Sequence, residues 1–193
     1  ITSDSSMKID MSLSELLNEA NAVTHDVQST FGKLTAEQLN WKPNPDSWSV
    51  AQCLDHLITI NGPMLAGISL ASSDAKSTRL IERLPFWSGL CGRMMVKALV
   101  PGGTQKFKAP PTGQPSASKL DPQIVSQFAA HQQNVAEKIK EVESRGLANV
   151  VMTSPFMSLI TYSLLDACRI IVVHERRHFE QARRVMAAEG FPT

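Results

Sequence analysis

The feature that most restricts the fold of this chain is the spacing of its apolar residues, which recur every three or four positions over long stretches. Residues at this spacing share one face of an α-helix, whereas a half-buried strand alternates apolar and polar residues. No alternating run longer than a few residues occurs in the sequence. The spacing therefore predicts an all-α fold, whose first helix runs from about Ser12 to Phe31 with an apolar face made of Leu13, Leu16, Leu17, Ala20, Val23, Val27 and Phe31.

The same spacing predicts three further long helices. We expect them from about Ser49 to Ser72, from about Pro122 to Ser144, and from Pro155 or Ser158 to Ala188. Pro63 lies inside the second of these and is expected to kink it, because proline lacks the backbone N–H that a helix interior uses. Ser49 stands where the side-chain N-cap of that helix is expected.

The region between the second and third long helices has a different composition. Residues 79–100 are apolar enough to pack but contain Pro85, so we expect short helical pieces there. Residues 101–122 hold five prolines and several glycines, which predict a long irregular crossover. We therefore predict one antiparallel four-helix-bundle domain over residues 12–190 with this crossover as a connection. Residues 1–11 are expected to be an N-terminal tail, partly a remnant of processing.

Near its C-terminus the sequence contains HERRH, from His174 to His178. Two imidazoles four residues apart lie one turn apart on a helix and can hold one metal ion. Both fall on the inward stripe of the last predicted helix, where each needs a polar partner that a shared cation supplies. Four charged residues beside this stripe are expected to be solvated: Arg169, Arg176, Glu180 and Arg183.

HERRH also fits HExxH, the zinc-protease pattern in which the glutamate, here Glu175, is the general base. Such a protease needs a third ligand downstream, but only fifteen residues follow His178 and none of them is histidine. A zinc protease is therefore kept only as a remote alternative. An upstream third ligand has to come from His25, His56 or His131.

Of these, His56 has a distinctive setting. The segment from Trp41 to Leu57 follows the pattern xWxPxPxxWSxxxxLxHL, and HxxxHxxQ is formed near the C-terminus by His174, His178 and Gln181. With the segments Phe107–Pro111 and Ser154–Phe156, these motifs make the chain similar to the DinB-like (YfiT-like) superfamily of metalloenzymes over nearly its whole length.

The resemblance implies a DinB/YfiT-like four-helix bundle in which the second and fourth helices carry three metal ligands, here His56, His174 and His178. Three neutral imidazoles without a protein carboxylate leave an open coordination position, as in catalytic metal sites. Zn²⁺ is the expected ion, and Ni²⁺ and Fe²⁺ are alternatives because imidazole suits all three. His25 and His131 are interpreted as ordinary surface or core residues.

Superfamily members include transferases that use low-molecular-weight thiols such as bacillithiol or mycothiol. The resemblance therefore implies a small-thiol S-transferase-like activity, with the thiol or water activated on the metal. A catalytically silent metal-binding or stress-response bundle is the alternative. Three residues are candidates for contacts around the ligands: Gln181, Glu175 and Cys53. Trp41 and Trp48 are interpreted as hydrophobic anchors of the turn before the second helix.

The charge and the cysteine content of the chain indicate which partners and which cellular compartment to expect. With 19 basic and 18 acidic residues the net charge is +1, so we expect neither nucleic acid nor a membrane as partner. We expect a small-molecule substrate, and a homodimer stays open. Three cysteines without CxxC spacing are typical of a reducing compartment. Because no signal-peptide pattern or bilayer-length apolar stretch occurs, we expect a cytoplasmic protein.

Overall fold

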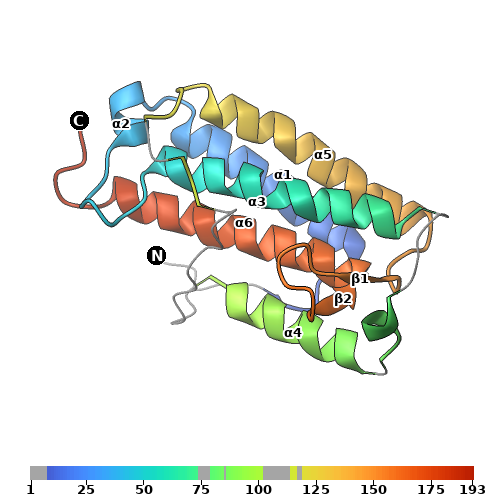
Figure 1. Ribbon diagram of the computed structural model, residues 1–193. Helices are drawn as coiled ribbons and strands as arrows, with labels where there is room; N and C mark the ends of the chain where they lie inside the picture. Colours follow the sequence, from blue (N-terminus) through green and yellow to red (C-terminus); the bar gives the residue numbers. More distant parts are fainter. Residues whose placement is uncertain (1–7, 74–78, 85, 102–113, 117–118) are drawn as a thin grey trace.

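The structure is a computed structural model, and it describes residues 8–73, 79–84, 86–101, 114–116 and 119–193. Four long helices form a bundle (Figure 1): α1 Leu13–Phe31, α3 Val50–Ala71, α5 Ile124–Ser144 and α6 Leu164–Met186. Smaller elements complete the described part of the chain: α2 Ala36–Asn40, the 3₁₀ turn η1 Leu80–Arg83, α4 Trp87–Leu99, and the strands β1 Val151–Thr153 and β2 Thr161–Ser163. The predicted all-α bundle is confirmed, with one small hairpin added.

The long helices do not all alternate in direction. The backbone of Leu120, just before α5, exchanges hydrogen bonds of 2.7 and 2.9 Å with the Asn40 side chain, which lies shortly before α3. α3 and α5 therefore start at the same end of the bundle and run in the same direction, whereas α6 runs opposite to α3 (Figure 1). The prediction of an antiparallel bundle is wrong for α3 and α5, because α4, which lies between them in the chain, runs back along the bundle.

Reciprocal side-chain caps fix the starts of α1 and α3. At α3, the Ser49 hydroxyl accepts a hydrogen bond from the Gln52 N–H at 3.1 Å, and the Gln52 side chain accepts one from the Ser49 N–H at 3.2 Å. Ser12 and Glu15 form the same pair at α1. Each pair satisfies two N–H groups that a helix start leaves unpaired. The predicted N-cap at Ser49 is confirmed, and it fixes the beginning of the helix that carries His56.

The last helix begins later than the sequence predicts. Residues 155–163 form the loop and second strand of a hairpin, in which Tyr162 pairs with Met152. Thr161 and Tyr162 are buried, and β-branched and aromatic side chains suit such a strand. The Ser163 hydroxyl then accepts a hydrogen bond from the Asp166 N–H at 3.0 Å and caps α6. A helix start at Pro155 or Ser158 is therefore wrong.

Two apolar clusters fill the bundle, one including Ile68, Val135 and Ile171, the other including Leu57, Phe128 and Phe179. Along α3, α5 and α6, one cluster gives way to the other part of the way along each helix. Polar side chains, most of them buried, lie between the two clusters at this position. We call them the polar layer: His56, Asn61, Gln132, His174, Glu175 and His178. Burying so many polar groups is unfavourable unless they have partners.

The charged flank of α6 is less exposed than predicted. The Arg176 side chain is only 17% exposed and donates hydrogen bonds to Glu19 at 2.7 Å and Asp26 at 2.6 Å, both on α1. Its guanidinium also lies 5.3 Å from the ring centroid of Phe179. The prediction that Arg176 is solvated is wrong, because α1 covers that flank.

None of the helices in the described part of the chain combines the length and the apolar composition needed to cross a membrane.

Candidate metal centre

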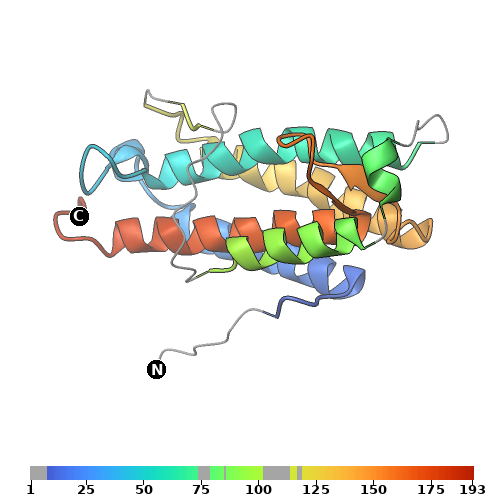
Figure 2. The same ribbon diagram turned by 60° about the horizontal axis from the view of Figure 1, so that its bottom comes forward.

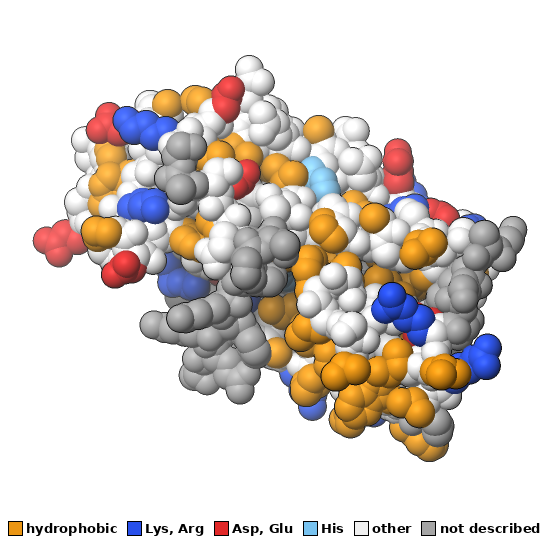
Figure 3. Space-filling view, in the orientation of Figure 1, with side chains coloured by type: hydrophobic (Ala, Val, Ile, Leu, Met, Phe, Trp, Pro, Cys, Tyr) orange, Lys and Arg blue, Asp and Glu red, His pale blue; other side chains and the backbone are white. Residues whose placement is uncertain are grey.

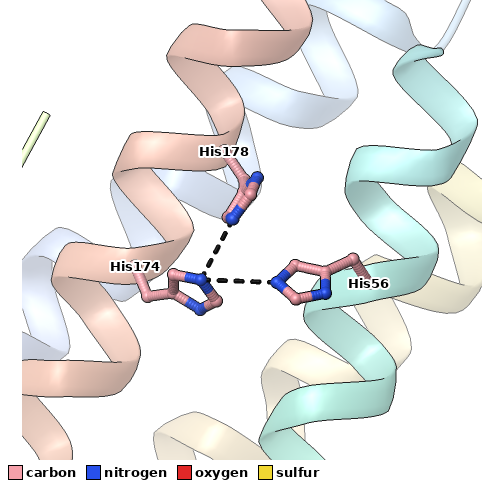
Figure 4. A group of neighbouring side chains, drawn as sticks. All are labelled: His56, His174 and His178. Carbon is pink, nitrogen blue, oxygen red and sulfur yellow. Dashed lines mark hydrogen bonds between the residues drawn. The ribbon is translucent and has the colours of Figure 1, made fainter. Parts of the chain in front are cut away.

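Three histidines of the polar layer converge on one point (Figure 4). His174 and His178 lie one turn apart on α6, and His56 faces them from α3. The Nε2 atom of His174 lies 3.4 Å from Nε2 of His56 and 3.0 Å from Nε2 of His178. One ligand atom from each ring lies within 4.8 Å of the others. The structure thus brings together the three residues that the sequence analysis selected as ligands.

The spacing of these nitrogens suits a shared cation better than mutual hydrogen bonds. A neutral imidazole carries one N–H, so the Nε2 atom of His174 can be donor or acceptor but cannot serve both neighbours well. Tetrahedral zinc with Zn–N bonds of about 2.0–2.1 Å sets its nitrogen ligands about 3.3 Å apart. The separations of 3.0 and 3.4 Å lie on either side of that value. The three imidazoles can therefore hold a divalent metal ion and leave a coordination position open.

Burial keeps the imidazoles of His174 and His178 neutral, which is the form that binds a metal. The pKa of His174 is lowered to about 3, first by burial and then by the neighbouring His56 and Arg177. Burial also holds the pKa of His178 well below its usual value, while a hydrogen bond with Gln181 acts in the opposite direction. Desolvation disfavours the charged imidazolium in both cases. No proton therefore has to leave these two rings before metal binds at neutral pH.

Trp48 forms a wall of the site. Its ring stacks on His178, with centroids 5.5 Å apart and planes 16° apart, and its centroid lies 4.9 Å from that of His56. Such contacts fix the orientation of both imidazoles and keep water from that side. From the sequence, Trp48 was expected only to anchor the turn before α3. Helical periodicity could not reveal the contact, because Trp48 precedes the N-cap Ser49 and lies outside α3.

Glu175, the glutamate of HERRH, takes no part in this cluster. Its side chain is fully buried, and Oε1 accepts hydrogen bonds from Asn61 at 2.7 Å and Gln132 at 2.6 Å. These partners lie on α3 and α5, so the carboxyl group links three helices. Burial raises the pKa of Glu175 to about 7, although the two hydrogen bonds lower it. The general base of a zinc protease must face a metal-bound water, whereas these bonds hold Glu175 against Asn61 and Gln132.

The remaining candidates have different surroundings. Gln181 is a hydrogen-bonding neighbour of His178, one turn further along α6. Cys53 is fully buried in an apolar cluster, and burial raises the pKa of its thiol to about 12, so it stays protonated. The His25 side chain is 82% exposed, and burial lowers the pKa of the partly buried His131. The three-histidine group includes none of these four side chains.

The stability that His174 contributes to the metal-free protein should depend on pH. Because folding lowers its pKa from 6.5 to about 3, this contribution is present above pH 6.5 and is lost as the pH falls toward 3. The test compares the free energies of unfolding of wild type and His174→Gln, both measured by urea denaturation with a chelator present. The difference, wild type minus variant, should decrease steadily as the pH falls from neutral into the acid range. A constant difference for His174→Gln would contradict the burial argument.

The family model of the DinB superfamily matches residues 19–182, a range that contains His56, His174 and His178 and covers most of the chain. Neither the curated proteins nor the solved structures contain a match. The matched range runs from α1 to α6 and includes both helices that carry the histidines. The chain therefore belongs to the DinB superfamily.

Proposed function

We propose that His56, His174 and His178 bind one divalent metal ion, with Zn²⁺ first, and that the protein is a small-thiol S-transferase-like enzyme. The observation that carries this proposal is the convergence of three imidazole nitrogens from two helices within 4.8 Å. Membership of the DinB superfamily supports it, because the sequence motifs that make this chain similar to the superfamily contain these histidines. Elemental analysis of the purified protein distinguishes Zn²⁺ from Ni²⁺ and Fe²⁺.

When bound, such an ion supplies a Lewis acid whose open position can take a small thiol as thiolate or lower the pKa of water. The chain's residues supply the surroundings. The three neutral imidazoles provide nitrogen ligands without negative charge, and Trp48 covers the rings of His56 and His178. The Gln181 amide, beside His178, can orient the thiol or the electrophile through hydrogen bonds.

Two alternatives differ from this proposal in what they require. A zinc protease needs Glu175 as a base facing the metal, and the bonds of Glu175 to Asn61 and Gln132 argue against that role. A catalytically silent metal-binding bundle needs the same three histidines but no substrate. Only a measurement of substrate turnover distinguishes such a silent metal-binding protein from an enzyme.

The test is thiol transfer by zinc-loaded protein with a metal content of about one per chain, as expected for a single site. Cysteine, bacillithiol and mycothiol are each offered with chlorodinitrobenzene. We expect formation of the dinitrophenyl thioether, in which a C–S bond forms, the C–Cl bond breaks, chloride leaves and the thiol proton passes to solvent. Zinc-free protein and free zinc are the controls and should give only the background rate. Background rates for all three thiols would favour the silent metal-binding protein.

A further inference from the structure

Exposed hydrophobic side chains gather on one part of the surface, shown in orange at the lower right of Figure 3. Of the nine large hydrophobic side chains that the described residues expose, all but Leu70 lie within residues 80–94 and 157–159. These ranges cover η1, most of α4 and the loop between β1 and β2. We define the α4 surface by the exposed side chains of Leu80, Leu84, Phe86, Leu90, Met94 and Leu159. Contiguous patches of this kind mark contact sites for proteins or membranes.

α4 stands outside the four-helix bundle, where it packs against α6 and β2 (Figure 2). Several side chains of the α4 surface are largely exposed: Leu80 is 81% exposed, Phe86 91% and Leu159 70%. They come from η1, the start of α4 and the loop between β1 and β2, so a rigid protein partner would have to fit three segments of the chain at once. The apolar interior of a bilayer accepts such side chains without matching pockets.

The backbone at Phe86 is strained in a way that presents its ring to solvent. Phe86 has a φ of 62°, the only positive value among the described residues other than glycine. This left-handed conformation is unfavourable for a residue with a bulky side chain. The ring contributes almost nothing to packing, because it is 91% exposed. A strained residue whose side chain does not stabilise the fold points to a contact that forms outside the folded chain.

Basic side chains surround these hydrophobic ones. Within residues 79–100 the exposed charges are all positive: Arg79, Arg83, Arg93 and Lys97. The one acidic residue in this segment, Glu82, is partly buried and accepts hydrogen bonds from the Thr153 hydroxyl at 2.9 Å and the Arg79 N–H at 3.3 Å. Residues 150–163 contain no charged side chain. The net charge of +1 for the whole chain therefore hides a locally basic surface.

We propose that the α4 surface docks on an anionic phospholipid bilayer, with Phe86 and its apolar neighbours in the interface and the basic side chains at the lipid phosphates. This combination of exposed apolar and basic side chains is typical of proteins that lie on membranes. A symmetric dimer through the same face is disfavoured, because each copy would bring its four basic side chains toward those of the other. The proposal differs from the sequence-based expectation that no membrane is a partner.

Co-sedimentation of the full chain with vesicles tests this proposal. We expect binding to vesicles of phosphatidylcholine with phosphatidylglycerol, weaker binding to phosphatidylcholine alone, and loss of the difference at high salt. The double variant Arg83→Gln/Arg93→Gln should bind the anionic vesicles roughly 5-fold more weakly for each charge removed. Phe86→Ser should weaken binding by about 10-fold, because it removes a large apolar side chain from the interface.

Leu70→Ser is the matched control, since Leu70 is 67% exposed but lies outside the α4 surface. It should bind the vesicles as wild type does. Equal sedimentation with both lipid mixtures, or equal weakening by Leu70→Ser and Phe86→Ser, would overturn the proposal. So would a dimer in light scattering that Phe86→Ser converts to monomer, because the surface would then be occupied by a second copy. Unchanged melting temperatures of the variants show that any loss of binding does not reflect unfolding.

Discussion

His56→Ala should release the metal. In the proposed site His56 is the ligand from α3, and its Nε2 atom lies 3.4 Å from Nε2 of His174. Removing a side chain that only hydrogen-bonds to a metal ligand weakens metal binding about 10–100-fold. Removing a ligand itself should therefore weaken binding by at least ~100-fold. Metal content per chain after dialysis, measured by elemental analysis, should therefore fall from full to nearly zero. Thiol transfer should disappear with it.

A second readout in the same variant is thermal stability. A ligand that binds only the native state raises stability by mass action, so added zinc should raise the melting temperature of wild type and leave that of His56→Ala nearly unchanged. His25→Ala is the control, because His25 is an exposed histidine on α1 and should change neither readout. If His56→Ala keeps full metal occupancy, the three-histidine site is wrong.

Much of this fold could be predicted from the sequence because its helices carry regular apolar stripes and clear caps. α1 and α3 begin within one residue of the predicted positions, and the caps at Ser12 and Ser49 explain why. The direction of α5 relative to α3 could not be predicted. Periodicity fixes the face that a helix buries but not the end from which the chain enters it. The hairpin was missed because its three-residue strands are too short to show a period of two.

The histidine cluster was predictable for a similar reason. The spacing of His174 and His178 places both on one stripe of α6, and the motif around Trp41–Leu57 singled out His56. The contacts that surround the cluster depend on tertiary packing. Trp48 reaches two of the histidines from outside a helix, and Arg176 is covered by α1, a segment about 150 residues away in the sequence. Neither contact can be predicted from the periodicity of a single helix.

Glu175 shows why HExxH was ambiguous in the sequence. A helical wheel places it to one side of His174, and only the neighbouring helices decide whether that side is solvent, metal or core. Here α3 and α5 supply Asn61 and Gln132 as hydrogen-bond donors to Oε1. Oε2 of Glu175 and Oε1 of Gln132 are buried and have no hydrogen-bond partner among the residues that the structure describes. An N–H or O–H in place of Oε2 would relieve this excess of acceptors in the polar layer.

Glu175→Ala should therefore destabilise the fold, whereas Glu175→Gln should not. Alanine leaves Asn61 and Gln132 without their acceptor and creates a cavity, and these losses together should lower the free energy of unfolding by about 2–5 kcal/mol. Glutamine keeps the accepting oxygen, adds N–H donors and carries no charge, so stability near neutral pH should be retained. Urea denaturation of the metal-free proteins measures both effects.

The two variants of Glu175 also distinguish its role from that of a catalytic base. Because folding raises its pKa from 4.5 to about 7, the stability that Glu175 contributes is present below pH 4.5 and is lost as the pH rises through about 7. Glu175→Gln has no carboxyl group at this position and does not lose stability in this way. The free energy of unfolding of this variant, relative to that of wild type, should therefore increase as the pH rises from 4.5 to about 7. It should also keep full metal content and at least part of the thiol-transfer activity, since no ligand is removed. Loss of activity with metal retained would instead make Glu175 a base, as HExxH proteases require.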